Sequence, residues 1–314
     1  MKKKILGIKP FNEIYFRSCY YHQLLAGVSA FNVNKDEVLL SFYTLIKENY
    51  SLCELNFNEY QKFKSKRGFK IKECNLNKEK LINWINKGNP VILGVDDYYL
   101  ESKKETYLKF HEPHFILAYG YDLEKDLVNV IEHDYRNDYN YHEKEISLTN
   151  LLTANHYFKT ISIKRKTCKV IIKEKRKKEI NYFDFIKPKF LKANQVNACK
   201  NLVNLRMMLL NSPNEIIKLA DQLSNYLGKV KEEYHILINT NLFKNDEKLI
   251  SIINKLIIAY QTTQSVIWKV NYVKDTNFIE KNMHKILNNV DMMIKLEKAV
   301  YNHLLEVCRN AKKY

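Results

Sequence analysis

The chain has 314 residues, of which 46% are hydrophobic and 28% charged, so it can bury a core and is not a disordered tail. Its 52 Lys and Arg against 35 Asp and Glu give a net charge of +17, which suits an acidic partner such as nucleic acid, anionic lipid or an acidic protein. No stretch approaches the roughly 18 to 20 uninterrupted apolar residues of a membrane-spanning helix, which excludes a transmembrane protein. The basic N-terminus also lacks the apolar core of a secretory signal, so we expect a cytoplasmic protein with no membrane partner.

Cysteine and glycine usage exclude several further classes of protein. The six cysteines contain no CxxC pair, which argues against a zinc ribbon and against a dense disulfide framework. Only one of the seven glycines, Gly228, lies beyond residue 120, and no glycine-rich phosphate loop is present. The sequence therefore predicts neither a P-loop enzyme nor a dinucleotide-binding domain. We expect no bound cofactor.

The first half of the chain carries short apolar segments with both helical and strand periodicity. Between Tyr20 and Phe31, apolar residues recur at i, i+1, i+4 and i+7, which predicts a helix that Cys19 opens. Further helices are expected over Asp36–Asn49 and Lys78–Asn86, and strands over Val91–Val95, His114–Tyr121, Leu127–Glu132 and Tyr157–Ile163. Helices followed by strands predict an α+β fold.

A helical region follows a boundary that we place near a basic run. Lys164–Lys166 and Lys173–Lys178 flank a strand-like segment, Cys168–Ile172. Such charge blocks are usually solvated edges or linkers, so we expect domains over residues 1–175 and 176–314. Beyond the boundary, apolar stripes at helical spacing predict a helical bundle with these residues in its core. The stripes comprise Ala198, Leu202, Leu205, Met208 and Leu209; Ile216, Ala220, Leu223 and Leu227; Leu249, Ile253, Leu256 and Ile257; and Ile286, Val290, Met293, Val300 and Leu304.

A candidate catalytic arrangement combines a Cys at a helix start, a His at a strand start and an acid at the end of the next strand. The free N–H groups of a helix N-terminus stabilise a thiolate, which favours Cys19 as a nucleophile. His114 would be its base or imidazolium partner, and an acid would fix the tautomer of the imidazole. Glu132 and Asp134 lie on the same strand face, and either can serve. The alternative is that Cys19 is an ordinary buried side chain.

A longer motif adds to this arrangement. It runs from Gly88 to Leu100 (GNPVILGVDDYYL) and continues with Tyr107, His111, His114 and the Gly120–Asp122 triplet. It resembles the N-terminal domain of the butirosin biosynthesis protein H family. The resemblance extends roughly over residues 15 to 165 and implies a papain-like cysteine-protease fold in the N-terminal half, followed by an α-helical C-terminal region. It also brings in the related bacteriocin-processing peptidases.

The resemblance implies roles for individual residues. Cys19 matches the nucleophile of the family and His114 its catalytic histidine. Glu132 stands where an Asp is usual, and Asp134 is the competing choice. The Gln that papain-like enzymes place before the Cys is missing here, so the oxyanion donors would be the backbone N–H of Cys19 and the side chain of Gln23.

The same motif contains the candidate substrate-binding residues Asp97, Tyr98, Tyr99 and His111. Tyr98 and Tyr99 line the pocket or pack in the core. His111 shapes the pocket from a loop or pairs with Asp97. His111 and His114 also have a metal-binding interpretation, but Pro113 between them breaks a helix and no HExxH pattern is present. We therefore predict no metal site.

In family terms, the expected activity is acyl transfer with formation of an amide bond in natural-product biosynthesis, of thiotemplated peptides or aminoglycosides. The acyl donor would be the phosphopantetheine thioester of an acidic acyl or peptidyl carrier protein, and the acceptor an amine. Two alternatives remain open. A papain-like peptidase or amidase would use the same residues, because hydrolysis differs only in the nucleophile that resolves the acyl-enzyme. A catalytically inactive basic binding module is the other, although no nucleic-acid-binding signature is present and a nucleic-acid partner is disfavoured.

Overall fold

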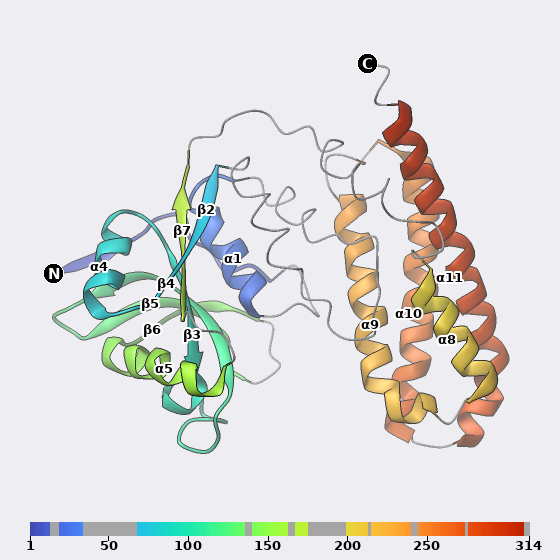
Figure 1. Ribbon diagram of the computed structural model, residues 1–314, viewed down its shortest axis with the longest axis horizontal. Coiled ribbons are helices and arrows are strands. Elements are labelled where there is room, and N and C mark those ends of the chain that lie inside the picture. The colour runs from blue at the N-terminus through green and yellow to red at the C-terminus, as the bar shows by residue number, and fades with distance from the viewer. Residues whose placement is uncertain are drawn as a thin grey trace. The chain divides into compact units, whose positions relative to one another are not determined.

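The computed structural model shows two compact units (Figure 1). Described residues up to Glu174 form the first unit, and those from Cys199 onward form the second. Each unit has its own hydrophobic core, so each is described by itself. The structure describes residues 1–12, 19–33, 68–135, 140–162, 167–174, 199–212, 215–239, 243, 245–273 and 276–310.

The first unit is built on a seven-stranded antiparallel sheet. The strands run in the order β2-β7-β3-β4-β5-β6, and β1 pairs with β4. The helices of this unit are α1 (Cys19–Ser29), α4 (Lys78–Asn86) and α5 (Leu148–Ile161). The first unit is therefore α+β, as the sequence predicts. The strands are β1 (Lys2–Lys4), β2 (Phe69–Cys74), β3 (Val91–Asp96), β4 (Pro113–Asp122), β5 (Leu127–Glu132), β6 (His142–Ser147) and β7 (Cys168–Lys173).

Helices cover both faces of this sheet (Figure 1). Helices α4 and α5 share a core with alternate residues of the central strands, among them Leu93 and Val170. On α1, Gly27 lies against Leu117 and Ile171, so closely that a Cβ there would meet Ile171 Cδ1 at 2.3 Å. Successive strand residues point to opposite faces, so α1 packs on the face opposite α4 and α5.

Local signals explain where α4 begins and ends. The side chain of Asn77 accepts a hydrogen bond from the Lys80 N–H at 2.9 Å, which caps the first turn. Gly88 follows the helix with φ of +72°, a left-handed conformation that glycine adopts without strain. The helix predicted over Lys78–Asn86 is confirmed at both ends.

The predictions for the rest of the first unit had different outcomes. The strand expected over Tyr157–Ile163 is wrong, because its described residues belong to α5 up to Ile161. Leu151, Ala154 and Phe158 are buried at i, i+3 and i+7, which is helical spacing. The strand-like segment predicted over Cys168–Ile172 is confirmed as β7, an inner strand between β2 and β3. The helix predicted over Asp36–Asn49 lies outside the described residues.

The second unit is helical, as predicted. It consists of α8 (Lys200–Asn211), α9 (Glu215–Asn239), α10 (Glu247–Val273) and α11 (Thr276–Asn310). Helix α10 packs against both α9 and α11, and α8 packs against α11. Apart from Ala198, which is not described, the predicted stripe residues belong to one core, in which Met208 is partly buried. None of the helices in the described part of the chain combines the length and hydropathy that crossing a bilayer requires.

Candidate functional site

The candidate site lies at one end of the sheet in the first unit. Strand β4 is antiparallel to both β3 and β5, so the start of β4 meets the ends of its two neighbours. This places His114, the second residue of β4, beside Glu132, the last residue of β5. Asp97 directly follows β3 at the same end. Cys19 is the first residue of α1, where the helix N-terminus leaves backbone N–H groups without helical partners.

The imidazole of His114 lies between an acid and a thiol. Its Nε2 is 2.9 Å from Glu132 Oε1, and both side chains are buried. The Cys19 thiol lies close enough to the same ring to raise its pKa. Because Nε2 is occupied by Glu132, Nδ1 is the nitrogen available to the sulfur. The structure therefore brings Cys19, His114 and Glu132 together, in the order nucleophile, base and orienting acid.

The electrostatics of this arrangement favour a charged imidazole. Burial by itself lowers the pKa of His114, but the charges of Glu132, Cys19 and Asp97 and the hydrogen bond with Cys19 outweigh it, so the pKa lies well above 6.5. Burial of Glu132 would raise its pKa, but the positive charges of His114 and Lys103 hold it well below 4.5. Imidazolium and carboxylate therefore stabilise one another, and the imidazolium is a proton donor beside Cys19.

A buried lysine that the sequence interpretation missed completes the environment of Glu132. Lys103 Nζ lies 2.9 Å from Glu132 Oε1 and donates to the backbone carbonyl of His133 at 2.7 Å. The backbone N–H of His133 also donates to Glu132 Oε1, at 2.9 Å. One carboxylate oxygen thus receives three donors, which fixes its position relative to His114. Lys103 lies in the polar stretch SKKETY, where no hydrophobic pattern predicts a buried side chain.

Asp134, the competing acid, does not face His114. Its carboxylate is half-exposed and pairs with Lys144 Nζ at 2.7 Å and His142 Nε2 at 3.3 Å. The hydrogen bond from Lys144 lowers the pKa of Asp134. Of the two acids that the sequence left open, Glu132 is the one within hydrogen-bond distance of His114.

Asp97 lies close enough to His114 and Glu132 to interact with their charges. Its side chain is buried, and Oδ1 has no hydrogen-bond partner among the described residues. Burial raises the pKa of Asp97 to about 6, although the positive charge of His114 opposes this. Asp97 therefore adds negative potential on the His114 side of the site.

The suggested pairing of His111 with Asp97 is wrong. His111 Nδ1 lies 2.6 Å from Asp96 Oδ2 instead. Successive residues point to opposite sides of a strand, so the side chains of Asp96 and Asp97 diverge at the end of β3. Asp96 also accepts hydrogen bonds from the backbone N–H groups of Tyr98 and Glu112, which hold its carboxylate in the turn after β3. The His111 ring, half-exposed, stacks on Tyr98 at 4.4 Å.

Tyr99 and Gln23 have distinct surroundings. The half-buried Tyr99 stacks on Tyr157 of α5 with ring centroids 4.4 Å apart, which is a packing role. Gln23 lies one helical turn after Cys19 and is fully buried, and its amide N and O have no partner among the described residues. Residues four apart on a helix lie on the same face, so Gln23 is on the Cys19 side of α1. Its amide N–H groups can therefore donate a hydrogen bond at the site.

A metal at this site is disfavoured by its own donor set. Ligand atoms of His114, Glu132 and His133 lie within 4.8 Å of one another. However, the Lys103 ammonium already lies 2.9 Å from Glu132 Oε1 and 3.1 Å from His133 Nδ1. Burial and the charge of His114 lower the pKa of His133 to about 3, so its ring is neutral. A lysine cation thus holds the position that a metal ion would need.

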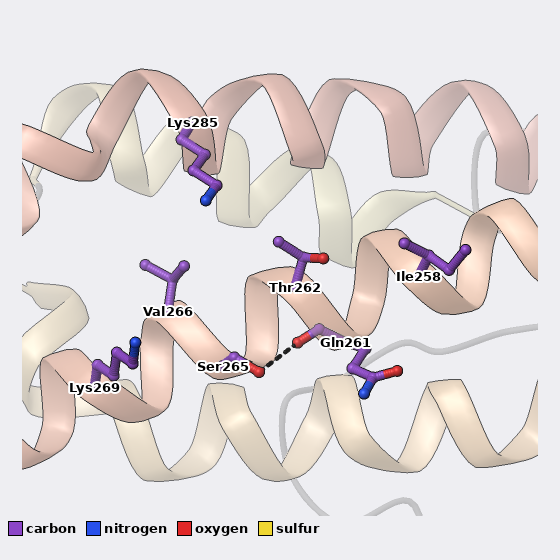
Figure 2. Close-up of a pocket in the computed structure, with 7 residues that line it drawn as sticks. All are labelled: Ile258, Gln261, Thr262, Ser265, Val266, Lys269 and Lys285. Atoms are coloured by element: carbon purple, nitrogen blue, oxygen red, sulfur yellow. Dashed lines mark hydrogen bonds between the residues drawn. The ribbon is translucent and has the colours of Figure 1, made fainter.

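The second unit carries a groove of its own on α10 and α11. It encloses about 340 Å³. Figure 2 shows that six of its seven residues belong to α10 and that Lys285 reaches it from α11. The Ser265 hydroxyl donates to the Gln261 carbonyl within its own helix. No residue of the catalytic arrangement lines this groove, so we do not assign the reaction to it.

Family models and curated sequences identify no relative of the chain. No protein-family model matches the chain, and no curated protein matches it in sequence. The likeness to the butirosin biosynthesis protein H family stays a prediction carried by its motif.

Proposed function

We propose that the protein is a cysteine-dependent acyltransferase that forms an amide bond. The observation that carries the proposal is the His114 ring, hydrogen-bonded through Nε2 to buried Glu132 and raised in pKa by the neighbouring Cys19 at the start of α1. Few arrangements other than nucleophilic catalysis require a thiol, an imidazole and a buried acid in this order. The sheet with a Cys-headed helix packed on it is compatible with the papain-like fold that the sequence motif suggests, and this fold is part of the proposal.

The first half-reaction would load the acyl group onto the enzyme. The Cys19 thiolate attacks the carbonyl carbon of a thioester and forms a tetrahedral intermediate. When the intermediate collapses, the carbon–sulfur bond of the donor breaks, and His114 gives its proton to the departing thiolate. The backbone N–H of Cys19 and the Gln23 amide are the proposed donors to the oxyanion.

The second half-reaction would transfer the acyl group to an amine. The amine nitrogen attacks the acyl-Cys19 carbonyl, and the neutral imidazole of His114 accepts a proton from it. Collapse of the second intermediate releases the amide and restores the Cys19 thiolate. Thioester exchange is nearly balanced in free energy, whereas amide formation from a thioester is downhill, so the amine step drives the sequence.

The charge of the chain supports an acidic donor. At +17, the protein would attract an acidic carrier protein with a phosphopantetheine arm and accelerate the encounter at low salt. We propose such a carrier protein as the donor and a small or carrier-bound amine as the acceptor. Because no second observation favours peptide hydrolysis, the amidase activity is treated as an outcome of the test.

The test is a product assay with a synthetic acyl-pantetheine thioester and a panel of amines, with amide and free acid quantified by mass spectrometry. We expect amide in excess of acid, a loss of at least about 10³-fold in Cys19→Ala and His114→Ala, and a smaller loss in Glu132→Gln. Asp134→Asn is the matched control and should stay within about twofold of wild type, because Asp134 faces away from His114. Acid as the main product with every amine would replace the transferase by a hydrolase.

A further inference from the structure

Two cysteines outside the candidate active site lie side by side in the sheet. Cys74 is the last residue of β2 and Cys168 the first residue of β7, and the two are register partners in the antiparallel ladder. Their sulfur atoms are 2.8 Å apart. No disulfide joins them in this structure; Cys168 is buried and Cys74 is partly exposed.

This placement satisfies the geometric requirements of a disulfide bond. Directly paired residues of an antiparallel ladder have Cα atoms roughly 4.5 to 5.5 Å apart, within the roughly 4.4 to 6.8 Å range of disulfides. A disulfide bond is about 2.05 Å long, so the two sulfur atoms need to approach by only about 0.8 Å. Rotation of the two side chains suffices, and the strands can keep their pairing.

We propose that Cys74 and Cys168 are a redox-active pair that a low-molecular-weight disulfide oxidises to an intrachain disulfide bond. The Cys74 thiolate attacks one sulfur of the small disulfide, forms a mixed disulfide and releases one small thiol. Cys168 then loses its proton to solvent, attacks the Cys74 sulfur and releases the second small thiol. The two protein thiols together lose two electrons and two protons, and the small disulfide is reduced to two thiols.

The surroundings of the two thiols set this order of events. Cys74 is the partly exposed sulfur, so the oxidant reaches it first. The hydrogen bond with Cys74, followed by burial, raises the pKa of the Cys168 thiol. Conversion of Cys74 to a mixed disulfide weakens that hydrogen bond, because the Cys74 sulfur can no longer carry a negative charge, and places an electrophilic sulfur beside Cys168.

The disulfide bond would link β2, at one end of the strand order, covalently to the inner strand β7. Strand β2 pairs with β7 alone on that path, whereas β7 also pairs with β3. The two cysteines are 94 residues apart in sequence, so the bond closes a long loop and restricts the unfolded chain strongly. The proposal does not depend on the acyl transfer reaction.

The experiment uses the full chain carrying Cys19→Ala, which removes the candidate nucleophile from the reaction. The protein is treated with oxidised glutathione, remaining thiols are alkylated, and peptides are mapped by mass spectrometry without reduction. We expect a cross-linked peptide that joins Cys74 to Cys168, which dithiothreitol abolishes. In Cys168→Ser we expect the trapped intermediate, a glutathione adduct on Cys74. Cys199→Ser, in the second unit, is the matched control and should form the cross-link as before.

A thermal measurement provides a second readout. Oxidation should raise the unfolding midpoint of the first unit by about 5 to 10 °C, because it constrains the unfolded state, and Cys74→Ser should abolish the difference. Two results would overturn the proposal: full alkylation of both cysteines after oxidant treatment, or a stable glutathione adduct on Cys74 while Cys168 is still present.

Discussion

The buried ion pair between Lys103 and Glu132 makes the most specific prediction. Both side chains are almost completely buried, and Nζ lies 2.9 Å from Oε1. Removing one partner of such a pair leaves an uncompensated buried charge, which costs about 3–5 kcal/mol. Lys103→Met and Glu132→Gln should therefore each lower the free energy of unfolding of the first unit by about that amount.

The double variant separates an ion pair from two independent effects. Lys103→Met combined with Glu132→Gln leaves neither charge, so its loss should fall short of the sum of the single losses by at least about 2 kcal/mol. Lys144 and Asp134 form the matched control, since their contact is shorter, at 2.7 Å, but the carboxylate is 49% exposed. Their coupling should stay below about 1 kcal/mol.

The chain offers a convenient assay for this cycle. It contains two tryptophans, Trp84 in α4 of the first unit and Trp268 in α10 of the second. In a Trp268→Phe background, urea unfolding followed by tryptophan fluorescence reports the first unit alone, which avoids a mixed transition. The side chain of Trp268 is largely exposed, so this replacement should be mild. Equal coupling energies for the buried and the exposed pair would refute the reasoning.

Four further predictions concern titration and packing. The imidazole of His114 should titrate well above pH 6.5 in nuclear magnetic resonance spectra. Glu132→Gln should lower the pKa of His114 by about 1–2 units, because a charged hydrogen bond worth about 1.5–3 kcal/mol is lost. An unchanged His114 pKa in this variant would contradict the prediction. Because the pKa of Glu132 is lowered by folding, its contribution to stability is fully present above pH 4.5 and is lost as the pH falls toward the folded-state value, so Glu132→Gln should flatten the acid limb of a urea-unfolding series. By the same argument with the opposite sign, the raised pKa of His114 stabilises the fold below pH 6.5, and this contribution is lost as the pH rises through the folded-state value. Gly94→Ala should lower the free energy of unfolding in urea by about 1–3 kcal/mol, because its Cβ would meet the Phe158 ring at 2.4 Å. Gly88→Ala has free space around the new Cβ and should cost about 1 kcal/mol, through its positive φ alone. Equal losses in the two variants would argue against the clash.

Sequence periodicity predicted those elements whose signal is local. The helix Lys78–Asn86 and the strand Leu127–Glu132 have their expected bounds, because a capping Asn, a following glycine and a continuous apolar run are visible in the chain. Strand β7 was seen only as a strand-like segment between basic runs, since its inner position depends on partners from β2 and β3. The Tyr157–Ile163 strand was wrong because its apolar residues also fit the helical spacing of α5.

The candidate site was predictable in part for the same reason. Cys19 and His114 each stand at the start of an element, which the sequence can indicate. The choice of Glu132 over Asp134 required coordinates, because strand periodicity put both on one face, whereas β5 ends at Glu132 and Asp134 lies beyond it. Lys103 was missed altogether, since its burial results from the contact with Glu132 and not from any local pattern. Tertiary contacts, which no single segment encodes, determine these assignments.

The most direct test of the proposed chemistry is the intact mass of the protein after mixing with an acyl-pantetheine thioester. Wild type should gain the mass of one acyl group, mapped to Cys19, and lose it again when an amine is added, with the amide as product. Cys19→Ala should gain none, and His114→Ala should load far more slowly. A protein that gains no acyl group with any thioester donor, or gains it equally in Cys19→Ala, would contradict the assignment of Cys19 as the nucleophile.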